Sequence, residues 1–160
     1  MRGARQTTDN RTMVEIRPVA PGDRAAWQEL FRAYGVFYET DFTDGVFDGV
    51  WAWLLDPAHE VSALVAEANG ELVGFAHIRR LSDTFTAGPA WFLDDLYVIP
   101  ERRGQSIARD LIERVARDGG AAGGGTLRWI TAADNTTAQK LYDRIATRMT
   151  WVVYERELGD

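Results

Sequence analysis

Short stretches in which apolar and polar residues alternate recur along this chain, and this two-residue period predicts β-strands. Asn69 and Gly70 lie between two of these stretches, and this dipeptide is typical of a two-residue hairpin turn. Pro100 ends another stretch, because proline cannot donate a backbone hydrogen bond to a neighbouring strand. Strands are therefore expected at residues 14–19, 61–68, 72–78, 91–99, 126–131 and 150–156.

Between the predicted strands, apolar residues recur at spacings of three and four, which is typical of amphipathic helices. The second of these helices stops before Pro57, since the residue that precedes a proline disfavours the helical conformation. The glycine-rich run at 119–125 is expected to be a flexible connection. Helices are expected at residues 27–38, 46–54, 107–116 and 138–146.

The predicted elements follow one another in the order β-α-α-β-β-β-α-β-α-β. This order predicts an α/β fold with a mixed central sheet, in which some neighbouring strands are antiparallel and others are parallel. The 160 residues fit one domain, assigned to 14–160, with no internal repeat or linker. Residues 1–13 are expected to form a flexible N-terminal tail, because they are mostly polar and lack the apolar segment of a secretory signal.

The composition excludes several classes of site. The chain contains no cysteine, which excludes disulfides, thiolate zinc sites and a cysteine nucleophile, and which fits a reducing compartment. The two histidines, His59 and His77, show no metal-ligand spacing, so no metal is expected. His77 is expected to be a structural residue and His59 to be exposed. No apolar run reaches the length of a membrane span.

The net charge of −6 at pH 7 argues against nucleic acid as a main partner, because phosphate backbones require a basic surface. An acidic surface attracts a cationic substrate. It also serves solubility, and the charge alone does not separate these two explanations.

A polar turn joins the strand at 91–99 to the helix at 107–116 and is a candidate site for a phosphate group. The first turn of a helix exposes unpaired backbone N–H groups and carries partial positive charge, so a pyrophosphate fits there. An ordinary turn with Ser106 as the helix N-cap explains the same residues equally well. The turn lacks the Gly-Lys-Ser/Thr ending of a Walker loop and the three-glycine spacing of a dinucleotide-binding loop.

Two separated blocks of sequence resemble the GNAT superfamily of N-acetyltransferases. Residues 93–104 read Leu-Asp-Asp-Leu-Tyr-Val-Ile-Pro-Glu-Arg-Arg-Gly, and residues 129–142 read Trp-Ile-Thr-Ala-Ala-Asp-Asn-Thr-Thr-Ala-Gln-Lys-Leu-Tyr. The family writes its phosphate loop as Arg/Gln-x-x-Gly-x-Gly/Ala. Arg103 and Ala108 match this pattern, whereas Ser106 replaces the central glycine. A side chain at that position crowds the phosphate or changes the turn.

Two further features are similar to one branch of the superfamily. The last helix continues as Asp-Arg-Ile-Ala-Thr-Arg at 143–148, without the Gly-Phe pair of most relatives, and the first helix is aromatic at 31–38. Both resemble the branch of yeast histone, polyamine and D-amino-acid acetyltransferases. The resemblance spans roughly residues 14 to 157.

The resemblance implies a GNAT-like mixed sheet and an enzyme that moves the acetyl group of acetyl-CoA to a primary amine. The amine attacks directly in a ternary complex, without a covalent enzyme intermediate. A small cationic amine as the acceptor, a homodimer and a cytoplasmic location are also expected. Two alternatives stay open. In one, the same fold binds or senses coenzyme A without turnover; in the other, an unrelated protein uses the turn for a different phosphate ligand.

By the same resemblance, backbone groups at the end of the strand at 91–99 meet the pantetheine arm of acetyl-CoA, and the turn that follows holds its pyrophosphate. Asn135 holds the pantetheine arm, caps its own helix, or does both. The residues expected to bind acetyl-CoA are Leu96, Tyr97, Val98, Arg102, Arg103, Gly104, Gln105, Ser106, Ile107, Ala108, Asn135 and Tyr142.

Tyr142 matches the family's helix tyrosine and is expected to protonate the departing thiolate, although a core tyrosine would fit the same apolar face. Asp94 is expected to be the general base, unless it and Asp95 bind backbone groups or arginine instead. Neighbouring strand residues point to opposite faces, so only one of the two is expected to face the substrate unless a bulge intervenes. Glu39 is a rival base, and Tyr38 and Glu39 are the expected substrate-binding residues.

Overall fold

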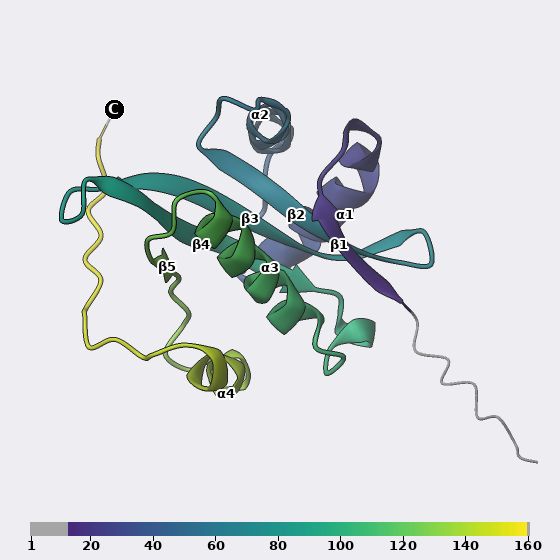
Figure 1. Ribbon diagram of the computed structural model, residues 1–160. Coiled ribbons are helices and arrows are strands. Elements are labelled where there is room, and N and C mark those ends of the chain that lie inside the picture. Colours follow the sequence, from purple (N-terminus) through teal and green to yellow (C-terminus); the bar gives the residue numbers. More distant parts are fainter. Residues whose placement is uncertain (1–12, 160) are drawn as a thin grey trace, which may run out of the picture. The chain divides into compact units, whose positions relative to one another are not determined.

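The computed structural model describes residues 13–159 (Figure 1). The expected flexible tail at 1–13 lies outside the described residues except for its last residue. The chain divides into two compact units, one that ends at Trp129 and one that begins at Ile130.

A five-stranded sheet forms the centre of the first unit, with the strands in the order β1-β2-β3-β4-β5. The pairs from β1 to β4 are antiparallel, whereas β4 and β5 are parallel, so the predicted mixed sheet is confirmed. The strands span Val14–Pro18 (β1), Val61–Ala68 (β2), Glu71–Asp83 (β3), Gly88–Val98 (β4) and Leu127–Arg128 (β5).

The turn between β2 and β3 is the predicted two-residue hairpin. Ala68 pairs with Glu71, and the two residues between them, Asn69 and Gly70, have φ angles of 54° and 80°. Positive φ at both central residues is what a turn needs if it is to follow the right-handed twist of its strands.

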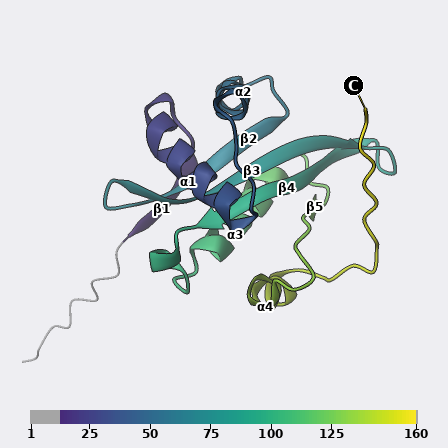
Figure 2. The ribbon, with the colours of Figure 1, turned by 180° about the vertical axis from the view of Figure 1, so that it is seen from behind.

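Helices α1 (Arg24–Phe37) and α3 (Ile107–Ala121) cover opposite faces of the sheet, as the two opposite views show (Figures 1 and 2). Helix α1 follows a short 3-10 turn, η1 (Pro21–Asp23), and precedes α2 (Asp44–Leu55). Phe31 of α1 lies 5.9 Å, between ring centroids, from both Phe47 of α2 and Phe75 of β3. The aromatic residues of the two helices therefore form a core against one face of the sheet, as the spacing predicted.

Helix α3 buries Ile107, Leu111, Ile112 and Val115 against the other face. It extends through Gly119, where an added Cβ would lie 3.0 Å from the indole nitrogen of Trp91. Three consecutive glycines, 123–125, follow with positive φ, and a side chain at Gly125 would overlap the carbonyl oxygen of Pro89. The expected flexible connection at 119–125 is therefore wrong, because these glycines allow close packing and a tight turn.

The second unit contains helix α4 (Thr136–Ile145), which begins at the N-cap residue Asn135. The strand predicted at 150–156 is wrong, because residues 146–159 contain no helix or strand. A strand requires a neighbour that takes its backbone hydrogen bonds, and no strand of the described chain pairs with this segment. The strand predicted at 126–131 is likewise reduced to Leu127–Arg128, the only residues that pair with β4.

Among residues 13–159, no helix combines the length and the apolar composition that crossing a membrane requires.

Candidate active site

The outer edge of β4 is open along its second half. β5 pairs with β4 only at Trp91 and Phe92, so the edge of residues 93–98 that faces away from β3 has no strand neighbour in the described chain. Tyr97 and Val98 are 9% and 8% exposed as whole residues, so their side chains are buried in the sheet and do not extend beyond this edge. An edge of unpaired N–H and C=O groups can bind an extended ligand with amide groups.

A β-bulge interrupts β4 beside this edge. His77 of β3 pairs with Asp95, but the next residue, Ile78, pairs with Leu93, so Asp94 is an extra residue. A bulge of this kind re-aims the side chains around it. Asp94 and Asp95 consequently line the same pocket. Only one of them was expected to face the substrate unless a bulge intervenes, and the bulge is present.

The pocket has a volume of about 400 Å³. Its walls come from α1, α2, β2, β3 and β4 and from the loop that precedes β2. Three carboxylates and one guanidinium face it, among aromatic and aliphatic side chains. The lining residues are Phe31, Val50, Trp53, His59, Glu60, Val61, His77, Arg79, Asp94 and Asp95.

Another hollow, of about 540 Å³, lies at the turn between β3 and β4. Its charged groups are Arg80 and Asp83 alone, and it adjoins the start of β4 rather than the open edge at its end. The smaller pocket therefore has the chemistry that an acceptor site needs.

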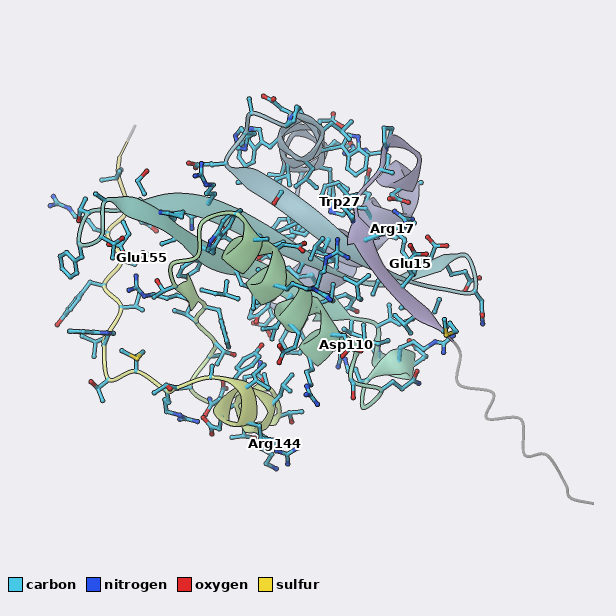
Figure 3. All side chains as sticks on the ribbon, viewed as in Figure 1. Glu15, Arg17, Trp27, Asp110, Arg144 and Glu155 are labelled. Carbon is cyan, nitrogen blue, oxygen red and sulfur yellow. The ribbon has the colours of Figure 1, made fainter. Side chains whose placement is uncertain are left out.

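His77 joins the core to the pocket. The indole Nε1 of Trp27 donates to His77 Nε2 over 2.9 Å, and His77 Nδ1 lies 2.8 Å from Asp95 Oδ2. Trp27, which belongs to α1 (Figure 3), is completely buried, and His77 is 2% exposed. The side chain of Asp95 is 24% exposed and is the end of this line of hydrogen bonds that reaches the pocket.

Tyr34 of α1 interacts electrostatically with Asp95 and with Tyr38. Burial raises the pKa of Tyr34, and the negative charge of Asp95 raises it further. Tyr34 is therefore a neutral phenol near the carboxylate.

Asp94 has a different partner. Arg79 of β3 donates to both of its oxygens, from Nη2 over 2.7 Å and from Nε over 3.1 Å. These hydrogen bonds raise the pKa of Arg79. The alternative in which the aspartates bind arginine therefore holds for Asp94, whereas the hydrogen-bond partner of Asp95 is His77.

The turn after β4 leads through a 3-10 turn, η2 (Pro100–Arg102), to α3. Gly104 and Ser106 both have positive φ, 76° and 68°, and residues 103–106 are exposed. Ser106 is the N-cap of α3, as the alternative of an ordinary turn requires, but its side chain makes no capping hydrogen bond. The turn therefore presents exposed backbone at the positive end of a 15-residue helix.

Arg103 is exposed, but its side chain folds back onto the end of β4. Its Nε donates to the carbonyl oxygen of Val98 over 3.1 Å, and its guanidinium lies 5.8 Å from the ring centroid of Tyr97. Arg103 thus ties the turn to the end of β4, which fixes the open edge and the helix N-terminus relative to each other.

Comparison with protein families decides between the alternatives left by the sequence. Residues 26–146 match the model of the acetyltransferase (GNAT) family. The chain belongs to the GNAT acetyltransferase family. It is an acetyl-CoA-dependent N-acetyltransferase, and the predicted family, fold and enzyme class are confirmed.

The relatives of this GNAT acetyltransferase act on different amines. It is 28% identical over 145 residues to the D-amino-acid N-acetyltransferase HPA3 of Saccharomyces cerevisiae, covering 89% of this chain and 90% of that protein. It is 30% identical over 121 residues to an aminoglycoside N(6')-acetyltransferase type 1 of Stenotrophomonas maltophilia, covering 66% and 69%. The structure of aminoglycoside N-acetyltransferase AAC(6')-Iy in complex with CoA aligns with a TM-score of 0.79 and 23% identity, over 91% of this chain and 95% of that chain.

The remaining predicted site residues of the acetyltransferase lie outside the pocket lining. Tyr38 ends α1 with its ring 4.9 Å from that of Tyr34, and Glu39 follows with a φ of 55°. Asn135 caps α4 by accepting a hydrogen bond from the backbone N–H of Ala138 over 3.3 Å. Tyr142 lies within α4, in the second unit. The substrate and catalytic roles expected of these residues stay predictions.

Sequence reasoning missed His77 and Asp95 as a pair. His77 sits in an apolar run and is typical of a buried structural residue, which it also is. Its partnership with Asp95 depends on the register of β3 and β4 and on the bulge, neither of which the alternation of residues specifies. Within the described residues, no group of three or more potential ligands is arranged to hold a metal ion.

Proposed function

We propose that this GNAT acetyltransferase acetylates a primary amine of a small molecule that carries more than one positive charge. The observation that supports this proposal is the charge of the pocket beside the open edge of β4. Glu60, Asp94 and Asp95 face it together with a single cation, Arg79. Arg79 balances one of the three carboxylates, and a dication would balance the other two. The carboxylate of a free amino acid would be repelled by them.

In the proposed reaction, the amine lies in this pocket and acetyl-CoA lies along the open edge. The amine nitrogen, after losing a proton, attacks the thioester carbon. The new C–N bond forms, the C–S bond breaks and the thiolate leaves. Backbone groups of Leu96, Tyr97 and Val98 bind the pantetheine arm, because their outer edge has no strand partner in the described chain.

The pyrophosphate binds at the turn, where the exposed backbone of Gly104, Gln105 and Ser106 meets the N-terminus of α3. Arg102 adds positive charge there, and Ile107 and Ala108 supply the first helical N–H groups. Arg103 acts by holding the turn against Val98.

Two further roles are carried over from the family pattern: Tyr142 donates a proton to the departing thiolate, and Asn135 binds the pantetheine arm. Asp94, a carboxylate in a largely apolar strand, is the candidate base. Tyr38 and Glu39 are the proposed contacts with the more distant part of the amine, next to Tyr34.

The test is an acetylation assay with a panel of amines and thiol detection. The protein contains no cysteine, so it contributes no thiol of its own to the signal. The panel holds neamine, spermidine, D-lysine and D-alanine, each with acetyl-CoA. We expect neamine or spermidine to give a kcat/KM at least about 10-fold above that of D-alanine, since each added charge contact is worth about 1 kcal/mol or more.

A preference for D-alanine would reject the dicationic acceptor while leaving the enzyme class intact. Saturable acetyl-CoA binding without release of thiol for any amine would instead favour a module that binds coenzyme A without turnover.

A further inference from the structure

The direction of the hydrogen bonds between Trp27 and Asp95 is fixed by chemistry. An indole nitrogen only donates, so His77 Nε2 is the acceptor and carries no proton. A neutral imidazole has its hydrogen on the other nitrogen, so Nδ1–H donates to Asp95 Oδ2. Asp95 is therefore an acceptor at this contact, as a carboxylate is.

The same geometry keeps the hydrogen of the neutral imidazole on Nδ1. A hydrogen on Nε2 would face the indole N–H across 2.9 Å, and two donors cannot bond to each other. The rings of Phe31 and Phe75 lie 4.9 and 4.6 Å from that of His77. The contact with Trp27 therefore selects the tautomer that donates to Asp95.

Among the described residues, Asp95 has no arginine or lysine partner. His77 donates to it through Nδ1–H, whereas the charge of neighbouring Asp94 is balanced by Arg79. The side chain of Asp95 is 24% exposed and lines the pocket. A carboxylate that is partly desolvated, held by this donor and not paired with arginine or lysine in the described chain suits an ammonium group.

We propose that Asp95 binds the ammonium group of the acceptor amine and that His77, locked by Trp27, positions the carboxylate for this contact. The proposal rests on the proposed function, because it names the residue of the proposed amine pocket that binds the amine. Asp95 touches the substrate. Trp27 and His77 act through Asp95 and are positioning residues.

The first experiment compares Asp95→Asn with Asp94→Asn, using neamine and spermidine as amines. Asparagine keeps the shape of aspartate but removes the charge, so we expect Asp95→Asn to lower kcat/KM for the amine about 100-fold, mainly through KM. The KM for acetyl-CoA should stay within about 3-fold, because the pyrophosphate turn is untouched. Asp94→Asn removes the candidate base and should lower kcat, but it should change the amine KM by about 10-fold or less, because Asp95 remains to bind the ammonium group. A larger rise in the amine KM in Asp94→Asn than in Asp95→Asn would overturn the proposal.

The second experiment separates positioning from simple support of the core. The amide nitrogen of asparagine falls near Nδ1 of histidine, so His77→Asn retains a donor to Asp95, whereas His77→Leu retains none. We expect His77→Leu to raise the amine KM about 10- to 100-fold and His77→Asn to recover most of that loss, since a carboxylate misplaced by about 1 Å costs up to 100-fold. Equal amine KM values in two folded variants would contradict a positioning role.

The third experiment needs no amine substrate and so distinguishes failure of this inference from failure of the proposed function. The protein has only two histidines, and long-range ¹H–¹⁵N spectra with a His59→Gln variant assign their ring nitrogens. We expect His77 to carry its ring proton on Nδ1 rather than on Nε2, because Trp27 donates to Nε2.

Trp27→Phe removes the donor to Nε2 and leaves an aromatic ring in its place. We expect the preference for Nδ1 to be lost in this variant and the amine KM to rise, because nothing then fixes the tautomer that donates to Asp95. A proton on Nε2, or a cationic ring, in the unmodified protein would overturn the proposal whatever its activity.

Discussion

At the scale of single residues, the turn before α3 has a serine where the family pattern has a glycine. The φ of Ser106 is 68°, which lies in the left-handed region that favours glycine. For an L-residue this conformation costs about 1–2 kcal/mol, although glycine in turn loses about 0.5–1 kcal/mol more backbone entropy on folding. Serine at this position therefore strains the turn.

Ser106→Gly is accordingly expected to stabilise the protein by about 0.5–1 kcal/mol, which is the difference between these two terms. The measurement is the free energy of unfolding from urea titration. Gly104→Ala is the matched control, because its φ is 76° and an added Cβ meets nothing within 4 Å. It introduces the same strain in open space and should destabilise by about 1 kcal/mol. A destabilising Ser106→Gly would show that the serine makes a contact that outweighs the strain.

A second residue-scale feature ties β1 to the start of α1. Arg17 of β1 (Figure 3) donates to Asp23 over 2.7 Å and to Glu67 over 2.6 Å. The hydrogen bond from Arg17 lowers the pKa of Asp23, and the backbone N–H of Ala20 lowers it further against the opposing effect of burial. The charged form of Asp23 is therefore favoured in the folded state.

This shift predicts a pH-dependent contribution to stability. A lowered pKa in the folded state stabilises the protein above the ordinary aspartate value of about 3.9, and this stabilisation is lost as pH falls through the folded pKa. Asp23→Asn should therefore destabilise by about 1 kcal/mol at pH 7, and the difference from the unmodified protein should disappear in strong acid. Urea titrations from neutral pH to below pH 4 measure this difference, and one that does not change with pH would contradict the assignment.

At the scale of elements, helices were easier to predict than strand details. The spacing of Trp27, Leu30 and Phe31 specifies a buried helix face by itself, and α1 has that face. Asp94 and Asp95 look the same in sequence, but their environments depend on pairing with β3, which inserts a bulge and gives one an arginine and the other a histidine. The glycines at 119–125 resembled a linker because composition does not reveal Trp91 and Pro89, against which they pack.

Helix α4 carries the residue on which the proposed chemistry of the leaving group depends. A free thiol has a pKa of about 8.5 and a phenol of about 10, so a tyrosine can supply the proton that a departing thiolate takes up. We expect Tyr142→Phe to lower kcat about 100-fold, within the range of general acid catalysis, with a smaller effect on the amine KM. Tyr154→Phe is the control, because Tyr154 is 90% exposed and belongs to no helix or strand. If both variants turn over at the same rate, Tyr142 is not the acid.

At the scale of the whole molecule, the order of elements was predictable up to α4, because each element has its own hydrophobic period and several end at glycine or proline. The final strand at 150–156 was not predictable, since a strand forms only where a neighbouring strand takes its backbone hydrogen bonds. Trp151 and Tyr154, which lie in that predicted strand, are 80% and 90% exposed. The homodimer expected from the resemblance also stays a prediction, because a dimer interface involves the surface of a second chain as well.

The net charge of −6 and the acidic pocket have opposite electrostatic effects on the two substrates of the enzyme. A dicationic amine is attracted to the acidic surface, whereas acetyl-CoA is an anion that approaches against it. Raising the salt concentration from about 10 to 200 mM shortens the Debye length from about 30 to below 10 Å and screens both effects. We therefore expect kcat/KM for neamine or spermidine to fall several-fold while the KM for acetyl-CoA stays constant or falls, as measured by the thiol assay. If the charge served solubility alone, salt would leave the amine kcat/KM unchanged, so the direction of these two responses decides between the explanations that composition left equal.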